Sequence, residues 1–296
     1  MFRHKGRHVT ERCGPVWVAG ETYEPYVGRW SRLVAHRFVR WMGAAPGGSW
    51  RDIGCGTGAV MQAVLDVAAP ETVVGVDPSA GYVAYARRNT ADQRAGFVLA
   101  DAVNLPFADS TASVAVSGLV LNFVSDAPRA AAEMARVVRP GGLVGVYVWD
   151  YGEGGMEAIR AFWDAASALD PDAQYLDEAV RFPLCGRAPL RELLVGSGLE
   201  DVEADEISVA TRFSDFDDYW QPFLGGQGPA PAYVASLPEE RRAELRERLR
   251  SALPRAADGS IPLRARAWTV RGRRGGSGGR SRRRAGSRAQ GRSTGR

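Results

Sequence analysis

Short β-rich runs alternate with helical stretches from residue 49 to residue 150, and this alternation restricts the fold more narrowly than any other pattern in the chain. Nearly continuous apolar strands separated by helices are typical of βαβ units, in which helices cover both faces of a parallel sheet. We therefore predict a doubly wound α/β fold with a mostly parallel sheet. The predicted strands are 50–53, 72–77, 97–101, 113–117 and 143–149, and the predicted helices are 59–67, 80–88 and 128–138.

Helical patterns dominate on both sides of this region. Apolar side chains recur at helical spacing over residues 27–41, which predicts an amphipathic helix lying on the domain that follows. In the helix expected to start near residue 128, Asp126 is the predicted N-cap. The remaining predictions are helices near 156–169, 190–195, 217–224 and 239–253, strands at 202–212 and 261–270, a loop at 225–231, and a pair between Glu244 and Arg248.

The positive charge of the chain is concentrated at its end. The formal net charge is +4 over 296 residues, and residues 271–296 contain ten arginines, eight glycines and no acidic residue. Without them, 28 basic residues stand against 34 acidic ones, a net charge of −6. We expect residues 271–296 to form a disordered Arg/Gly/Ser tail. Only one basic residue is a lysine, an arginine excess typical of a GC-rich bacterial genome.

Cysteine, histidine and hydropathy patterns disfavour several classes of protein. The three cysteines and three histidines lie far apart, which argues against a structural metal site and a disulfide scaffold. No apolar run reaches the length of about 18 residues that a membrane helix needs. The apolar stretch at 15–19 is too short for a signal peptide. We expect a cytoplasmic protein without metal or membrane contact.

A glycine-rich loop, Asp-Ile-Gly-Cys-Gly-Thr-Gly at 52–58, joins a predicted strand to a predicted helix. Ligands bind at such a junction in doubly wound sheets, because glycines let a ligand approach the backbone. Two cofactors fit. Gly54, Gly56 and Ala59 loosely satisfy the dinucleotide pattern, but Asp52 is poorly placed for a pyrophosphate and well placed for a cationic amino-acid group. The loop therefore favours S-adenosylmethionine over NAD.

Four segments between residues 50 and 149 resemble, in order, motifs of the class I S-adenosylmethionine-dependent methyltransferases. They match the small-molecule branch, which includes the quinone-biosynthesis C-methyltransferases. The resemblance covers one third of the chain, and Arg51 and Ser113 depart from the family pattern. The segments are the glycine loop 52–58, the strand end at Asp77, the pair Asp101-Ala102 followed by 104–107, and Arg-Pro-Gly-Gly at 139–142.

The resemblance implies a seven-stranded, Rossmann-like sheet with a helical insertion and an N-terminal helical cap. Together with composition, it divides the chain into a mobile N-terminus (1–20), a cap (21–46), a methyltransferase domain (47–270) and the tail (271–296). The domain would comprise a cofactor half (47–150) and a substrate insertion (about 151–260).

S-adenosylmethionine is the cofactor that the resemblance implies. Asp77 would hold the ribose hydroxyls, while Asp101 and the backbone N–H of Ala102 would read the adenine edge. Arg29 would either meet the methionine carboxylate or lie on a solvated helix face. The expected cofactor-binding residues are Asp52, Gly54, Cys55, Gly56, Gly58, Asp77, Asp101, Ala102 and Arg29.

Methyl transfer needs alignment of donor and acceptor more than it needs a base. No catalytic residue is assigned, and the weak candidates for a base are His36, Asp150 and Glu153. Aromatic residues of the insertion suit a small apolar or aromatic acceptor, although most aromatic side chains at helical spacing belong to the core. These residues are Phe162, Trp163, Phe182, Trp220 and Phe223.

Two other functions stay open at this point. An RNA-binding or RNA-modifying protein would use the arginine-rich tail, but residues 1–270 form no basic stripe, which disfavours a nucleic-acid partner. An NAD-dependent oxidoreductase would use the same glycine loop.

Overall fold

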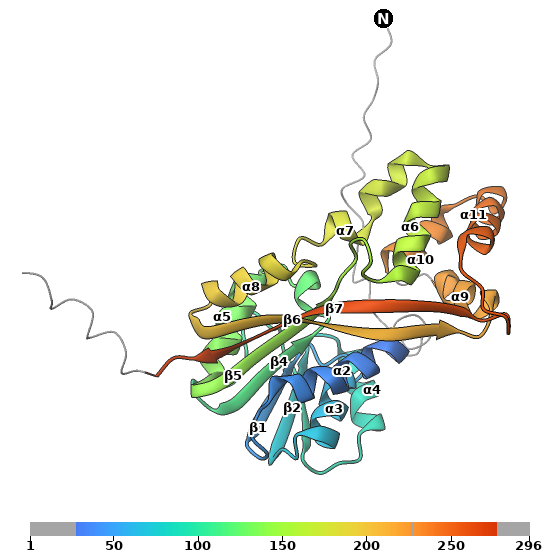
Figure 1. The fold of residues 1–296 in the computed structure, drawn as a ribbon. Coiled ribbons are helices and arrows are strands. Elements are labelled where there is room, and N and C mark those ends of the chain that lie inside the picture. Colours follow the sequence, from blue (N-terminus) through green and yellow to red (C-terminus); the bar gives the residue numbers. More distant parts are fainter. Residues whose placement is uncertain (1–27, 226–227, 277–296) are drawn as a thin grey trace, which may run out of the picture.

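The computed structural model describes residues 28–225 and 228–276, and within them seven strands form one sheet (Figure 1). The strand order is β3-β2-β1-β4-β5-β7-β6, with β1 to β5 parallel and β7 antiparallel to both β5 and β6. The predicted doubly wound, mostly parallel seven-stranded sheet is confirmed. The strands are β1 (Ser49–Ile53), β2 (Thr72–Asp77), β3 (Ala95–Leu99), β4 (Ala112–Gly118), β5 (Val138–Trp149), β6 (Leu199–Phe213) and β7 (Ile261–Arg274).

Helices cover both faces of the sheet, as the apolar strands require. One face carries α2 (Arg29–Met42), α3 (Ala59–Val67) and α4 (Ala80–Asn89), and the other carries α5 (Ala127–Val137) and α8 (Arg187–Gly196). The carboxylate of Asp126 accepts a hydrogen bond from the backbone N–H of Arg129, which confirms it as the N-cap of α5.

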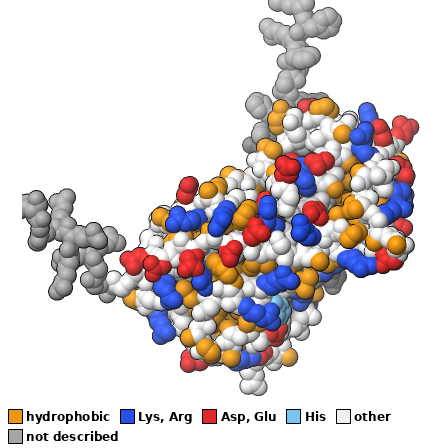
Figure 2. Space-filling view, in the orientation of Figure 1, with side chains coloured by type: hydrophobic (Ala, Val, Ile, Leu, Met, Phe, Trp, Pro, Cys, Tyr) orange, Lys and Arg blue, Asp and Glu red, His pale blue; other side chains and the backbone are white. Residues whose placement is uncertain are grey.

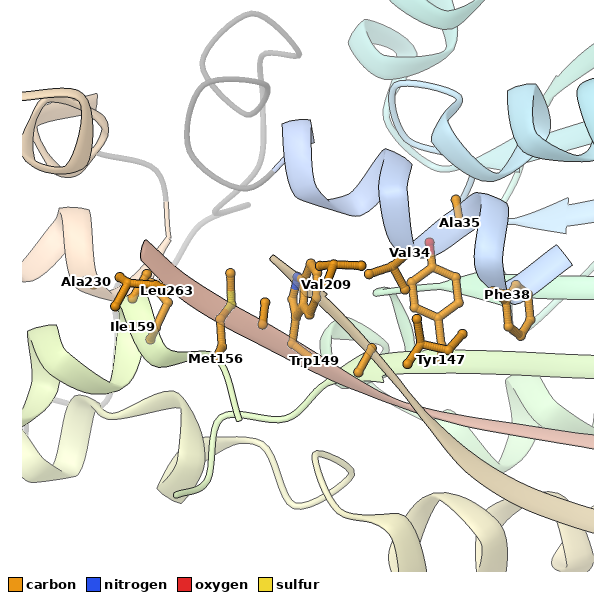
Figure 3. Close-up of a cluster of buried hydrophobic side chains, with 14 of the residues drawn as sticks. Val34, Ala35, Phe38, Tyr147, Trp149, Met156, Ile159, Val209, Ala230 and Leu263 are labelled. Carbon is orange, nitrogen blue, oxygen red and sulfur yellow. The ribbon is translucent and has the colours of Figure 1, made fainter. Parts of the chain in front are cut away.

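The predicted insertion consists of two helical segments separated by β6. The first contains α6 (Glu157–Leu169), a 3-10 helix η3 (Pro171–Leu176), α7 (Glu178–Arg181) and α8. The second contains α9 (Phe216–Trp220), η4 (Gln221–Gly225), α10 (Pro229–Ser236) and α11 (Glu239–Ala252). In the first segment α6 and η3, and in the second segment all the helices, share a hydrophobic core with α2, while α8 packs in the core of the opposite face. Figure 3 shows buried side chains running from Phe38 through Trp149 to Ile159 and Ala230. The helical segments are thereby fixed against the sheet.

Several predicted boundaries differ from the structure. β3 ends at Leu99, so Asp101 lies in the following loop and not in the strand. α10 begins at Pro229, inside the predicted loop 225–231, because proline fits the first turn of a helix. Glu244 pairs with Arg241, one turn before it, and not with the predicted Arg248.

The start of the predicted disordered tail is ordered. β7 continues to Arg274, although the sequence predicts that the disordered tail begins at residue 271. The prediction from arginine composition is wrong for residues 271–274, because their backbone pairs with β5 and β6 whatever their side chains are. The predicted mobile segment 1–20, most of the first half of the cap and residues 277–296 lie outside the described residues.

Candidate functional site

The glycine loop follows β1 at the edge where the parallel strands end. Gly54 and Cys55 both donate backbone N–H bonds to the Val76 carbonyl, at 2.7 and 3.0 Å, which ties the loop to β2. Gly54, Gly56 and Gly58 have φ of +74°, +50° and +92°, a region that other residues rarely adopt. A Cβ at Gly54 would lie 2.4 Å from the Val120 side chain, whereas a Cβ at Gly56 would have no described atom within 4 Å. The loop is therefore closed toward β4 and open at Gly56.

Asp52 lies at the base of this loop and is completely buried. Neither carboxylate oxygen has a hydrogen-bond partner among the described residues. Burial raises the pKa of Asp52 to about 7; the nearby backbone N–H of Met61 lowers that pKa, and the charge of Asp77 raises it. A buried carboxylate without a partner is costly unless a cation or a proton meets it.

Asp77 ends β2 and faces the loop. Its carboxylate accepts hydrogen bonds from the backbone N–H groups of Gly56 (3.0 Å) and Ser79 (2.9 Å). Burial raises the pKa of Asp77, and these two hydrogen bonds lower it. The side chain of Cys55 points away from the open edge, since a Cβ at Gly75 would lie 2.9 Å from its Sγ. Only the backbone of Cys55 is thus placed to meet a ligand.

The third strand brings Asp101 and Ala102 to the same edge. Asp77 is in register with Leu99 of β3, and the Ala100 N–H donates to the Asp77 carbonyl at 3.2 Å. Asp101 is exposed and accepts a hydrogen bond from the Val103 N–H at 3.1 Å, while Ala102 is buried. The glycine loop, Asp77 and Asp101-Ala102 therefore meet at the carboxyl edge of β1, β2 and β3, whereas the fourth motif, residues 139–142, lies at the start of β5.

Arg29 and His36 lie on α2 and have partners elsewhere. Arg29 pairs with Asp218 at 2.8 Å, and its guanidinium stacks on Trp30 and Phe213. The Nε2 atom of His36 lies 2.9 Å from an Asp66 carboxylate oxygen on α3. Among the described residues, the contacts of these two side chains join α2 to α9, β6 and α3. Their roles at the cofactor or as a base stay predictions.

Asp150 and Glu153 follow β5, where an acceptor is expected. Asp150 is buried, and Arg266 of β7 donates to it through Nε (2.8 Å) and Nη2 (2.6 Å). The other carboxylate oxygen of Asp150 accepts a hydrogen bond from the Gly152 N–H at 2.9 Å. Arg266 also reaches the Glu153 carbonyl at 3.4 Å. Asp150 thus anchors the turn after β5, and Glu153 is exposed.

An aromatic and polar group lies beside this turn, and of its members the sequence analysis named only Phe182. It joins the 3-10 helix η2 (Leu121–Phe123), which follows β4, to the chain after α7. Asn122 donates from Nδ2 to the Cys185 Sγ at 2.9 Å, while its Oδ1 has no partner among the described residues. The Phe182 ring lies 5.1 Å from the Phe123 ring and 6.0 Å from the Tyr151 ring. The position of Asn122, just past the fourth strand, was the signal that could have found it.

This group, Asn122, Phe123, Tyr151, Phe182 and Cys185, is called the η2 edge below. Val120, next to η2, is the residue that packs on Gly54, so the η2 edge adjoins the glycine loop. Burial raises the pKa of the Cys185 thiol to about 12, so the thiol is uncharged at neutral pH.

Most insertion aromatics belong to the core. Phe162, Trp163, Trp220 and Phe223 are at most 3% exposed, which leaves Phe182 as the partly exposed member of the predicted set. Glu178 is buried with them and accepts a hydrogen bond from the Trp163 indole N–H. Burial raises the pKa of Glu178 to about 7. No sequence pattern pointed to this carboxyl.

Residues 28–225 and 228–276 offer neither a metal site nor a membrane-spanning helix. No group of three or more His, Cys, Asp or Glu side chains there is arranged to hold a metal ion. No described helix is long and apolar enough to cross a membrane. On the face shown in Figure 2, basic and acidic side chains are interspersed, so a basic stripe is not seen on that face of the described residues.

Comparisons with known proteins indicate the family. A model of the methyltransferase domain matches residues 51–146. Malonyl-[acyl-carrier protein] O-methyltransferase of Pectobacterium atrosepticum is 29% identical over 154 residues, which are 52% of this chain and 58% of that protein. The 2-phytyl-1,4-naphtoquinone methyltransferase of Nostoc punctiforme is 31% identical over 159 residues, 50% of this chain and 68% of that protein. This chain thus spans little more than half the length of the first relative.

The solved structures add the fold. Phosphoethanolamine N-methyltransferase 2 of Haemonchus contortus, in complex with S-adenosyl-L-methionine, is 16% identical and has a TM-score of 0.53, covering 86% of this chain and 56% of that one. The fold, the loop geometry and the relatives together define the class of protein. The chain belongs to the class I S-adenosylmethionine-dependent methyltransferases.

Proposed function

We propose that this protein transfers a methyl group from S-adenosylmethionine to a small, planar, mostly apolar acceptor. The observation that carries the choice of cofactor is the buried, unpartnered carboxylate of Asp52 at the base of the glycine loop. The ammonium group of a methionine moiety would neutralise this carboxylate. The pyrophosphate of NAD would instead be repelled by it.

The residues at this edge of the sheet fit the cofactor in three further respects. Open space at Gly56 admits a ligand against the backbone. Asp77 would accept hydrogen bonds from the ribose hydroxyls, and Asp101 with the Ala102 N–H would read the adenine edge. When bound, S-adenosylmethionine supplies a methyl group on a sulfonium centre for an in-line displacement. The chain then has to align the acceptor and exclude water, and alignment accounts for up to roughly 7–11 kcal/mol of such a barrier.

The η2 edge is our candidate for the acceptor side. It adjoins the glycine loop, and three aromatic rings there offer stacking surface for a flat ring. The free Oδ1 of Asn122 would accept a hydrogen bond from an acceptor hydroxyl. The two relatives named above differ in acceptor, a malonyl thioester in one and a naphthoquinone in the other. The aromatic lining favours the second class for this chain.

Calorimetric titration of the full chain with S-adenosylhomocysteine and with NAD tests the cofactor. We expect S-adenosylhomocysteine to bind and NAD not to. Asp77→Ala should weaken binding by about 1.5–3 kcal/mol, the loss of charge-assisted hydrogen bonds to two hydroxyls. The exposed control Asp164→Asn should leave binding unchanged. If the protein binds NAD and does not bind S-adenosylhomocysteine, the proposal is wrong and an oxidoreductase is favoured instead.

A panel of acceptors tests the second half of the proposal. Methyl transfer from S-adenosylmethionine is measured for a naphthoquinol, a malonyl thioester and a short RNA. We expect transfer to the naphthoquinol, and we expect Asn122→Ala to raise its KM at least several-fold while the affinity for S-adenosylhomocysteine stays the same. Transfer only to the thioester or to RNA would refute the planar acceptor while leaving the cofactor assignment intact.

A further inference from the structure

The loop between β3 and β4, residues 100–111, starts with Asp101 and Ala102 and is held to α5 by three charged side chains. Arg129, Glu133 and Arg136 project from successive turns of α5 toward this loop. They are called the α5 clamp below. Each bonds to the loop backbone, and none belongs to the residues assigned to the cofactor.

Glu133 is the centre of the clamp and is 3% exposed. Its Oε2 accepts a hydrogen bond from the Leu105 N–H at 2.9 Å. Arg136 binds the same carboxylate through two parallel bonds, Nε to Oε1 at 2.8 Å and Nη2 to Oε2 at 2.7 Å. This two-bond geometry fixes both side chains relative to the loop.

The two arginines hold alternate carbonyls of the loop. Arg136 donates to the Leu105 carbonyl at 3.1 Å and to the Phe107 carbonyl at 2.8 Å. Arg129 donates from Nε to the Val103 carbonyl at 3.2 Å. The clamp therefore sets the path of the chain from residue 103 to residue 107.

The clamp is linked to Asp101 through Val103. The Val103 N–H donates to the Asp101 carboxylate, and the Asn104 N–H donates to the Asp101 carbonyl, both at 3.1 Å. A displacement of Val103 would therefore move the Asp101 carboxylate and the neighbouring Ala102 N–H. A buried ion pair is weak evidence for stability alone, because desolvation offsets much of its attraction.

We propose that Glu133 and Arg136 are positioning residues that set how the protein discriminates the adenine base of its cofactor. The inference rests on the proposed function, in which Asp101 and Ala102 read the adenine edge. The clamp does not touch the cofactor. It holds the loop that carries Asp101 and Ala102, the groups that would recognise a 6-amino purine.

Arg136→Lys and Glu133→Gln test the proposal. Lysine keeps the charge but cannot make the two parallel bonds, and glutamine keeps the shape but loses the charge. Affinities for S-adenosylhomocysteine and for its hypoxanthine analogue, S-inosylhomocysteine, are measured by calorimetry. We expect each variant to bind S-adenosylhomocysteine about tenfold more weakly, and the preference for adenine over hypoxanthine to fall several-fold. The KM for S-adenosylmethionine should rise while kcat stays the same.

Arg160→Lys is the matched control. Arg160 is about as buried as Arg136 (21% against 29% exposed) and pairs with the buried Asp177 at 2.6 Å, but it lies on α6. All three variants should lower the melting temperature, and only the two clamp variants should change the base preference. An unchanged preference in the clamp variants, or an equal change in Arg160→Lys, would overturn the proposal. If the unmodified protein binds no S-adenosylhomocysteine, the proposed function fails instead.

Discussion

At the scale of single residues, Asp52 combines a carboxylate with complete burial. Its pKa is raised from 3.8 to about 7 in the folded protein. Between about pH 4 and pH 7 the folded state therefore binds more protons than the unfolded state, so the free energy of unfolding falls as pH rises through this window. Glu178, with a pKa raised from 4.5 to about 7, acts in the same direction.

Asp52→Asn should therefore stabilise the protein at pH 8 and weaken its cofactor. We expect a gain of roughly 1–3 kcal/mol in the free energy of unfolding at pH 8, and little change at pH 4, because the native carboxyl is then protonated. Urea denaturation at both pH values, with calorimetry of S-adenosylhomocysteine, measures the two effects. If the variant and the parent are equally stable at pH 8, the buried carboxylate does not destabilise the protein. If the affinity for S-adenosylhomocysteine is undiminished, Asp52 does not bind the cofactor.

Arg29 has two possible roles, cofactor binding and pairing with Asp218, and a pair of matched variants distinguishes them. If Arg29 binds the cofactor, Arg29→Ala should bind S-adenosylhomocysteine more weakly than Asp218→Ala does, because only the arginine would contact the methionine carboxylate. If Arg29 only pairs with Asp218, the two variants should lower the melting temperature by similar small amounts, because a partly exposed ion pair contributes about 1 kcal/mol or less. Calorimetry and thermal unfolding of both variants decide between them.

The sequence predicted residues whose role depends on local pattern and missed those whose role depends on a partner far along the chain. Gly54, Gly56 and Asp77 follow from a loop between a strand and a helix, which needs no long-range information. Asp150 is predicted from its place after a strand, but its partner Arg266, 116 residues away, could not be predicted from local pattern. Asn122 follows a predicted strand, but its contact with Cys185, 63 residues away, could not be predicted from local pattern.

At the scale of secondary-structure elements, β7 shows the same limit. Composition predicts that the ordered part of the chain ends at residue 270. The Arg271 side chain nevertheless makes several contacts that join α2 to the sheet. It pairs with Glu203 at 2.7 Å, donates to the Trp41 and Met42 carbonyls at 2.5 and 2.9 Å, and stacks on the Trp41 ring. The antiparallel strand was extended by backbone pairing, which an arginine-rich sequence does not forbid.

Arg271→Ala should therefore destabilise the protein. Removing the side chain leaves the last carbonyls of α2 without their donor and removes the stacking on Trp41, so we expect a loss of about 1–3 kcal/mol in the free energy of unfolding. Arg273→Ala is the control, because the Arg273 side chain donates a single 3.2 Å hydrogen bond, to the Gly141 carbonyl, among the described residues. Similar losses in the two variants, measured by urea denaturation, would show that Arg271 does not hold α2.

At the scale of the whole molecule, the last strand of the chain lies inside the sheet and not at its edge. β7 is the last strand in the chain but lies between β5 and β6, so its final residues pair with the beginnings of both neighbours: Leu143 is opposite Arg273 and Leu199 is opposite Arg274. A truncation in this region therefore acts on the cofactor half and on the insertion together. The position of the cut decides its effect.

A chain ending at Gly276 should keep the melting temperature and the affinity for S-adenosylhomocysteine of the full chain, since β7 is complete and the removed residues contain almost no apolar side chain. A chain ending at Val270 removes the ladder between β7 and the first residues of β5 and β6, together with the contacts of Arg271. We expect it to melt several degrees lower, because a loss of about 1 kcal/mol shifts the melting temperature of a domain of this size by roughly 2–4 °C. Thermal unfolding and calorimetry of both truncations, with the full chain beside them, measure the difference. If the chain ending at Gly276 loses cofactor binding or methyl transfer, residues 277–296 belong to the function. If both truncations melt at the temperature of the full chain, the end of β7 does not stabilise the sheet.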